Sequence, residues 1–295
     1  MSRLRFSGHE TFIVRTFWPK KGYDFIMEGG DFNAKDAVVK LGVGKNMVSS
    51  INYWMKSLYL IDESNNIPSL FADFLFGETG NDLFLEDIGS VWLLHYYLIN
   101  HNYASIYSLV FNKFRKERSI FTKSQLHSFI KRHFHEQNNN GYNSNTIDKD
   151  AGVLLRTYNT PDYKSIKKDY EDEIGGLFLE LELMSSKRDV DLDEKKVDWF
   201  DLTGKERPTL PAEVVLFTIL DSYPESQNIS FRRLEIEENS PGMVFALSKE
   251  GLFMKLKEIE SINKGVIISE SAGNITMVIP EGIDKWELLK NYYAE

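Results

Sequence analysis

A short stretch near the N-terminus gathers side chains that could do chemistry on a phosphate ester. Within eighteen residues it holds His9, Glu10, Arg15, Lys20, Lys21 and Asp24. A histidine can move a proton near neutral pH, a glutamate can orient it, and arginine or lysine can hold a phosphodiester. These residue types predict a catalytic group of His9, Glu10 and Arg15. The alternative is that His9 and Glu10 cap or bridge the domain while Arg15, Lys20 and Lys21 touch phosphates.

Several other chemistries are excluded by composition and spacing. The chain has no cysteine, which removes a disulfide framework, a thiolate nucleophile and a cysteine-ligated metal centre. The run Gly42–Asn46 is not a phosphate loop, because Val39 stands where a glycine is needed and Asn46 where a serine or threonine is needed. The run His9–Ile13 lacks the second histidine of a zinc protease. No residue of the sequence is therefore assigned as a metal ligand.

Residues 32–61 predict a helix-turn-helix that would bring the N-terminal histidine, arginine and lysines close to a nucleic acid. They read as a helix, a glycine turn at Gly42–Gly44 and a second helix, which is the spacing of a helix-turn-helix. The inner face of the first helix is predicted to hold Ala37, Val38 and Leu41. The second helix is predicted to bury Met47, Ile51, Trp54, Met55 and Leu58, which recur at helical spacing.

The opposite face of the second helix carries the predicted nucleic-acid contacts. Its members are Lys45, Asn46, Ser49, Ser50, Asn52 and Tyr53. Small hydrogen-bonding side chains with one cation are the types that reach phosphates and base edges in a major groove. The pattern predicts DNA as the partner, although some helix-turn-helix units only pack against other proteins.

The charge distribution agrees with this interpretation despite a net charge of −9. Residues 1–60 hold nine Lys/Arg against five Asp/Glu, a local net of +4. Residues 105–135 hold seven Lys/Arg against one Glu, a local net of +6. The acidic residues concentrate elsewhere, with fourteen Asp/Glu against eight Lys/Arg in 161–206. Because binding depends on the local field, an acidic protein with basic faces can hold DNA in a salt-sensitive manner.

We expect a mainly α fold with small β hairpins, built from tandem winged-helix or helix-turn-helix units. The predicted divisions are an N-terminal helix-turn-helix domain at 1–78, a helical winged-helix-like domain at 79–160, a β insertion and linker at 161–208, and a C-terminal winged-helix domain at 209–295.

Within the two C-terminal divisions, period-two alternation predicts a strand over 177–184, with a partner strand over 199–202. One continuous helix is predicted over 243–262, followed by a hairpin around 271–274. Arg232 and Arg233 are further candidate DNA contacts, weakened by the glutamates around them.

Four segments resemble a known bacterial family. They are FSGHETFIVRTFWPKKGYD at 6–24, LGVGKNMVSSINYW at 41–54, LEDIGSVWLLH at 85–95 and KERPTLPAEVV at 205–215. Together they resemble the family called domain of unknown function 4007, and the match runs nearly end to end. Members of that family lie beside PAPS-reductase-like genes in DNA phosphorothioation and related antiviral defence clusters. The resemblance implies a DNA-facing role in marking or defending the genome, with DNA nicking as an associated activity.

We therefore expect a DNA-binding component of a phosphorothioation system. If it is a nickase, Mg²⁺ or Mn²⁺ would be its cofactor; a non-enzymatic adaptor and a transcriptional regulator are the alternatives. Other proteins of such a system are expected partners, and a homodimer is one assembly that such units form. The start of the chain has no apolar segment typical of a signal peptide, and its apolar runs are short, so we expect a cytoplasmic location away from membranes.

Overall fold

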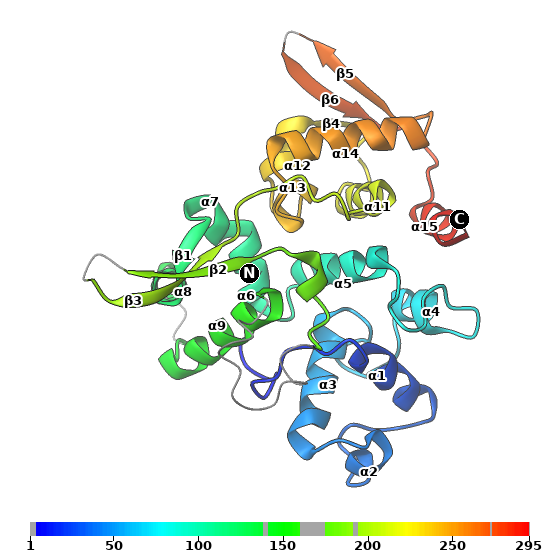
Figure 1. Ribbon diagram of the computed structural model, residues 1–295. Helices are drawn as coiled ribbons and strands as arrows, with labels where there is room; N and C mark the ends of the chain where they lie inside the picture. The colour runs from blue at the N-terminus through cyan, green and yellow to red at the C-terminus, as the bar shows by residue number, and fades with distance from the viewer. Residues whose placement is uncertain (1–3, 138–140, 160–174, 191–193, 272, 295) are drawn as a thin grey trace.

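Three tiers of helices stack along the long axis of the molecule, with a small sheet beside the middle tier and another at the top of the upper tier (Figure 1). This computed structural model describes residues 4–137, 141–159, 175–190, 194–271 and 273–294. The described part is mainly helical and carries two three-stranded antiparallel sheets. The expected mainly α fold with small β elements is confirmed at that level.

The first tier is a cluster of three helices with a fourth beside it. These are α1 (Trp18–Met27), α2 (Ala37–Leu41), α3 (Lys45–Ser57) and α4 (Leu70–Phe76). Gly22 lets α1 approach α3 closely, because a Cβ at this position would lie 2.7 Å from the Met55 sulfur. After α3 the chain makes a single antiparallel bridge between Ile61 and Pro68.

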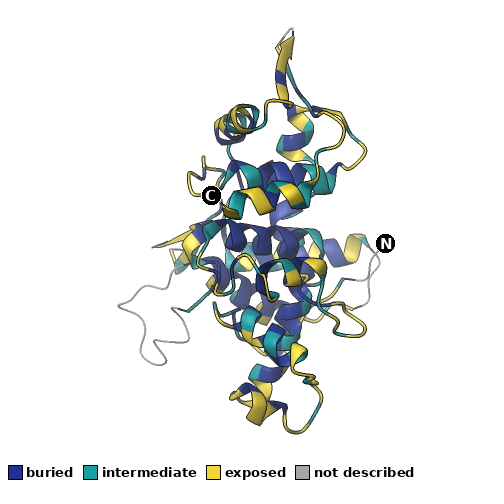
Figure 2. Ribbon diagram, turned by 90° about the vertical axis from the view of Figure 1, so that its right-hand side faces the viewer, coloured by how far each residue is buried: buried dark blue, intermediate teal, exposed yellow. Residues whose placement is uncertain are grey.

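The middle tier is organised around one helix that is buried on every side. Helix α5 (Ile88–Asn100) begins at Asp87, whose side chain accepts a hydrogen bond from the Gly89 N–H. Almost all of its side chains are buried, and buried residues fill the middle of the molecule (Figure 2). The elements that follow it are α6 (Ser105–Leu109), the π-helical turn η1 (Val110–Phe114), α7 (Arg115–Glu117), α8 (Lys123–Glu136) and α9 (Ser144–Tyr158).

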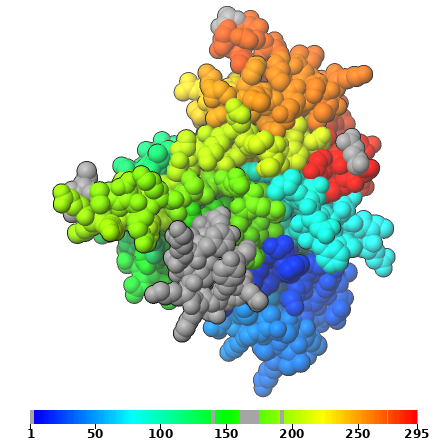
Figure 3. Space-filling model, viewed as in Figure 1, coloured from blue at the N-terminus to red at the C-terminus, as the bar shows by residue number. Residues whose placement is uncertain are grey.

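The middle tier also carries the first sheet, which projects as an arm (Figures 1 and 3). Its strands are β1 (Ile120–Thr122), β2 (Ser185–Val190) and β3 (Lys196–Asp201), in the order β1–β3–β2. Strand β3 pairs with β1 through Phe121 and Phe200 and with β2 through Ser186 and Phe200. The insertion predicted at 161–208 is thus joined to the unit before it, although 160–174 lie outside the described residues.

The predicted strand over 177–184 is wrong. This stretch contains the 3-10 turn η2 (Leu179–Leu181) and turns back at Glu182, whose φ is 47°. The burial does not alternate along the stretch, because the adjacent residues Leu177 and Phe178 are both buried, as are Leu183 and Met184. The strand begins only at Ser185, while the predicted partner over 199–202 does coincide with β3.

The third tier is formed by residues 209–294. Its elements are α11 (Ala212–Ser222), β4 (Asn228–Ser230), α12 (Phe231–Ile236), α13 (Pro241–Val244), α14 (Lys249–Ile262), β5 (Ile267–Ser271), β6 (Asn274–Val278) and α15 (Lys285–Ala294). The second sheet has the order β4–β6–β5, so the predicted hairpin is confirmed. The single helix predicted over 243–262 is wrong, because the chain breaks at Phe245–Ser248, with Ala246 at a φ of 46°, and restarts at the Ser248 cap.

One buried histidine joins the middle and upper tiers. His95 of α5 is fully buried; one of its ring nitrogens lies 2.9 Å from the Tyr158 hydroxyl and the other 2.8 Å from the Val244 carbonyl. Arg115 donates to the neighbouring carbonyls of Gly242 and Met243. These contacts dock α13 onto α5, α9 and the π-helical turn. No helix within the described ranges is both long and apolar enough to span a bilayer.

Candidate nucleic-acid interface

The turn between α2 and α3 has the geometry that its two glycines predict. Gly42 ends α2 in the left-handed region at a φ of 63°, where a side chain would be strained. Gly44 is extended and serves as the N-cap residue of α3. The reversal places α3 across α1 and α2, and Leu41 and Ala37 are buried as predicted. Val38 is not on this inner face, since it is 37% exposed.

The start of α3 presents an exposed polar surface. Lys45, Asn46 and Ser49 are exposed, and the Ser49 hydroxyl donates weakly to the Lys45 carbonyl at 3.5 Å. Within the described part of the chain, the side chains of Lys45 and Asn46 have no hydrogen-bond or ion-pair partner. Asn52, two turns along the helix, is half-buried. The start of α3 therefore presents the Lys45 ammonium, the Asn46 amide and the Ser49 hydroxyl to solvent. Such groups bind phosphates and base edges.

Two residues predicted for this polar surface are instead buried, so their place on the exposed face was wrong. Ser50 is fully buried and its hydroxyl donates to the His9 carbonyl at 3.0 Å. Tyr53 is 6% exposed and lies edge-on to the His9 ring, with its own ring against Gly8. The N-terminal segment covers this side of α3, which the sequence pattern of α3 alone does not reveal. The opposite side packs as expected, with Ile51, Trp54, Met55 and Leu58 buried and Met47 half-buried.

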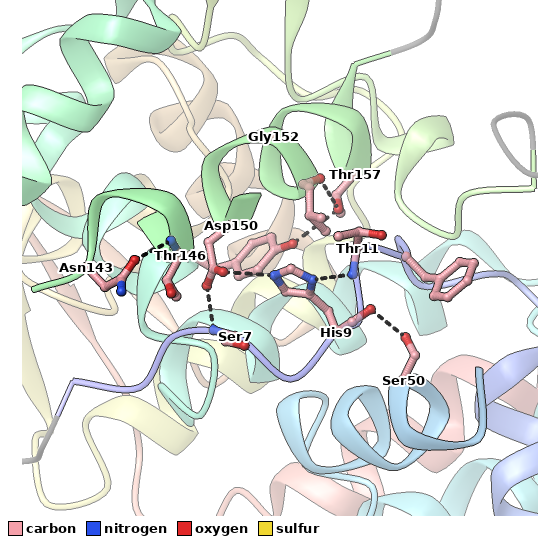
Figure 4. A network of polar contacts seen from close by, with 12 residues as sticks. Ser7, His9, Thr11, Ser50, Asn143, Thr146, Asp150, Gly152 and Thr157 are labelled. Atoms are coloured by element: carbon pink, nitrogen blue, oxygen red, sulfur yellow. Dashed lines mark hydrogen bonds and ion pairs between the residues drawn. The ribbon is translucent and has the colours of Figure 1, made fainter. Parts of the chain in front are cut away.

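His9 lies at the centre of a buried polar network that joins α3 to α9 (Figure 4). Its Nδ1 accepts a hydrogen bond from the Thr11 N–H at 3.0 Å, which leaves Nε2 to carry the proton. Nε2 donates to Asp150 Oδ1 at 3.0 Å, and Oδ2 of the same carboxylate accepts from the Ser7 N–H at 2.9 Å. His9 is 4% exposed and Asp150 2%, so neither reaches solvent. The geometry matches the bridging alternative for His9.

The other members of the N-terminal group do not converge on His9. Glu10 is exposed on a turn and has a φ of 47°. Arg15 is half-buried, with its guanidinium carbon 5.3 Å from the Trp18 ring centre. Lys20 pairs with Asp24 at 2.5 Å, and Lys21 donates to the Leu41 carbonyl at 3.0 Å.

Lys20, Lys21 and Asp24 line a hollow of about 340 Å³ on the surface of α1, beside the exposed ring of Phe17. The two lysines therefore lie near α2 and remain candidates for phosphate contact, while His9 faces inward.

The predicted catalytic residues offer few free donors for a divalent metal ion. Within the described ranges there is no group of three or more histidine, aspartate or glutamate side chains placed to hold one. Both ring nitrogens of His9 are already engaged, so the predicted catalytic group offers Glu10 alone as a carboxylate.

The two arginines predicted in the third tier have different surroundings. Arg232 is exposed at the start of α12. Arg233 is half-buried; its Nε lies 2.8 Å from Glu237 Oε1 and its guanidinium lies over the Tyr223 ring. The glutamate hydrogen bond raises the pKa of Arg233, and the Glu237 carboxylate competes with a phosphate for the guanidinium. Of the two arginines, Arg232 is the exposed one and the better candidate for a DNA contact.

Asp150 is the important residue that the sequence pattern does not single out. It occupies the apolar face of α9 beside Ile147, Ala151 and Leu154. A carboxylate at such a position requires buried donors, which here come from His9 and the Ser7 backbone. An acidic residue at helical spacing from three apolar ones was the only available signal, and it does not identify the partner.

Comparisons with known proteins agree on one relationship. The model of the family described as "Protein of unknown function (DUF4007)" matches residues 6–293. The solved structure titled "Magnesium ion-bound SspB crystal structure" is similar with a TM-score of 0.82 and 28% identity. A second, titled "SspB crystal structure", has a TM-score of 0.83 and 27% identity. Each comparison covers 99% of this chain and 88% of the other. Among proteins with curated descriptions, none matches the chain.

Proposed function

The chain belongs to the DUF4007 family, and from that premise we propose that it is a DNA-binding component of a bacterial DNA phosphorothioation system that serves genome marking or antiviral defence. The similarity to SspB over nearly the whole chain supports this assignment. Its partners would be DNA and the other proteins of such a system. A transcriptional regulator and a non-enzymatic adaptor are the competing assignments.

The exposed start of α3 is the observation that carries the proposal. A sharp glycine turn sets α3 across α1 and α2, and Lys45, Asn46 and Ser49 lie free on its outer side. In helix-turn-helix proteins the first residues of the second helix contact base edges and phosphates. Because Ser50 and Tyr53 are buried, the contact surface is narrower than the sequence pattern predicts and is confined to the first turn and a half of α3.

The third tier has a different role in this proposal from that of α3. Residues 209–278 run in the order helix, strand, three helices and hairpin, with the sheet order β4–β6–β5, and this order supports a winged-helix unit. Around α12, however, Arg233 is tied to Glu237, and Glu235 and Glu238 lie close by along the chain. An acidic winged helix suits a docking surface for a protein partner or a second copy better than a DNA contact.

The test is a pair of substitutions on the first turns of α3. Lys45→Glu with Ser49→Glu replaces a cation and a hydroxyl by two carboxylates, which repel DNA phosphates. We expect this variant to lose most of its affinity for duplex DNA in a gel shift. Lys264→Glu with Ser269→Glu makes the same exposed change on the third tier and should leave the affinity unchanged. Equal binding by both variants would show that α3 is not the DNA-contacting helix.

DNA nicking is a separate question that a plasmid assay decides. One similar structure is titled as magnesium ion-bound. In the described ranges of this chain, no group of three or more histidine, aspartate or glutamate side chains is placed to hold an ion. Supercoiled plasmid would be incubated with Mg²⁺, Mn²⁺ or no metal and with His9→Ala and Glu10→Ala variants. The protein is a nickase if it nicks the plasmid in a metal-dependent manner and if the Glu10→Ala variant, shown to be folded, no longer does so. Plasmid that stays supercoiled favours the adaptor, and tight binding confined to one promoter favours the regulator.

A further inference from the structure

Two adjoining hollows lie over the beginning of α8. The first, of about 630 Å³, lies between the starts of α8 and α9 and is lined by Lys123, Ser124, His127, Ser144, Asn145, Asp148 and Lys149. The second, of about 870 Å³, extends toward strand β3 and includes Arg118, Gln125, Trp199 and Phe200. Lys123 and Ser124 line both hollows, so the two form one continuous surface, which we call the α8 groove.

The charge of the α8 groove is positive. Arg118, Lys123 and Lys149 supply three cations. The two carboxylates that line it are already paired: Asp148 lies 2.9 Å from Lys123, and Asp198 binds Arg188 through both oxygens. Arg118 and Lys149 are exposed and, within the described ranges, have no ion-pair partner. The groove therefore has two uncompensated cations that are accessible to an anion.

The remaining lining residues suit a polyanionic backbone. Ser124, Gln125, Ser144 and Asn145 offer hydroxyl and amide donors of the kind that bind phosphate oxygens. His127 Nε2 lies 3.2 Å from the Tyr142 and Ser144 hydroxyls, so its ring is held at the groove edge. Half-buried Trp199 and Phe200 give an apolar wall against which sugar rings can pack. Two adjoining hollows with cations in each fit a run of phosphates better than a single small ligand.

The α8 groove is rigidly connected to α3. Lys149, which lines the groove, precedes Asp150, which points inward to His9. His9 in turn accepts from Ser50 of α3 through its carbonyl, so α9 and α3 hold the same N-terminal segment between them (Figure 4). Three buried polar groups therefore link the groove, through α9 and the N-terminal segment, to the inner side of α3.

We propose that the α8 groove is a second contact for the DNA backbone, which engages the duplex that α3 contacts. The inference rests on the proposed function and adds to it a distinct, sequence-independent surface. Phosphates would bind to Arg118 and Lys149, and the α3 contacts would set the register along the DNA. The basic stretch at 105–135 noted in the sequence contributes Arg118 and Lys123 to this surface.

The test measures the salt dependence of binding to a short fluorescein-labelled DNA duplex by fluorescence anisotropy. Arg118→Glu with Lys149→Glu removes two phosphate contacts. The slope of log K against log salt should fall by about 2, since each contact contributes roughly 0.9. We expect at least a tenfold loss of affinity at low salt. Lys264→Glu with Lys290→Glu carries the same charge change on exposed residues of the third tier and should keep the full slope.

The outcomes separate this inference from the proposed function. Thermal unfolding of both variants checks that each is folded. The proposed function holds if the wild-type protein binds DNA and the Lys45→Glu, Ser49→Glu variant does not. In that case, the groove contact alone is overturned if the Arg118→Glu, Lys149→Glu variant has the same salt slope and affinity as the Lys264→Glu, Lys290→Glu control. If the wild-type protein does not bind duplex DNA at all, the proposed function fails first.

Discussion

His95 makes the fold sensitive to mild acid, and the size of the effect follows from its surroundings. The side chain is fully buried between α5, α9 and α13. Burial lowers the pKa of His95 from 6.5 to about 3; the hydrogen bond to Val244 opposes this shift and Arg207 adds to it. The neutral ring donates from Nε2 to the Val244 carbonyl and accepts at Nδ1 from the Tyr158 hydroxyl, so it satisfies both partners without a charge.

The sign of the pH dependence follows from proton linkage. Between the folded and unfolded pKa values the unfolded chain binds the extra proton, so the free energy of unfolding rises with pH. The stabilisation by neutral His95 is complete above pH 6.5 and is lost as the pH falls toward 3. Each pH unit in that window costs about 1.4 kcal/mol. From pH 6.5 to 5, before most carboxylates titrate, the loss is about 2 kcal/mol.

Urea unfolding followed by circular dichroism at pH 7.5, 6 and 5 measures this loss. His95→Gln keeps a donor and an acceptor of similar reach but cannot titrate. Its free energy of unfolding should therefore fall less than that of the wild-type protein as the pH is lowered, and the difference should equal the loss assigned to His95. His135→Gln changes an exposed histidine on α8 and should retain the wild-type slope. His101 and His133, whose pKa values burial also lowers, contribute equally to all three proteins. A His95→Gln variant with the full wild-type slope would refute the assignment.

Three further predictions concern the contacts that hold the tiers together. Gly8→Ala should lower stability by about 2 kcal/mol or more, because φ is 111° and a Cβ would lie 2.5 Å from the Tyr53 ring; Gly273→Ala, with a φ of 76° and no neighbour within 4 Å, should cost about half as much in urea unfolding. Asp150→Asn should speed amide hydrogen exchange in residues 7–12, because Ser7 and His9 both donate to this carboxylate; Asp148→Asn, on the surface, should not, and equal exchange rates would contradict the network. Arg207→Met should cost about 3 kcal/mol, since the 4% exposed guanidinium donates to the carbonyls of Glu182 and Leu183; Lys264→Met is the exposed control, and an unchanged midpoint for Arg207→Met would show that water replaces these bonds.

Local signals in the sequence were enough to predict most individual elements. The Thr122 cap predicts the start of α8, where threonine and Gln125 form a complete capping box. Gly42 predicts the reversal before α3, and β-branched residues predict the hairpin of β5 and β6. These features depend on residues a few positions apart, which the chain itself keeps close together.

The errors arise where distant segments decide the outcome. Ser50 and Tyr53 look like an outer face until residues 7–12 cover them, because their burial depends on a segment some forty residues earlier in the chain. The strand predicted at 177–184 has the alternation of a half-exposed strand, but neighbouring residues are buried together at each end of the stretch, at Leu177–Phe178 and at Leu183–Met184. The partner of His9, Asp150, is 141 positions away, a pairing that a single sequence does not reveal. The division into four domains stays a prediction, with β1 and β3 joining two of them.

The central claim is that the outer side of the first turns of α3 touches DNA, and site-specific photocrosslinking tests it most directly. A photoreactive phenylalanine analogue would replace Ser49, which is exposed on α3, or Ser269, which is equally exposed on β5. After irradiation with labelled duplex DNA, the account predicts a protein–DNA adduct from position 49 and none from position 269. An adduct from position 269 alone, with none from position 49 in a protein that binds DNA, would contradict it.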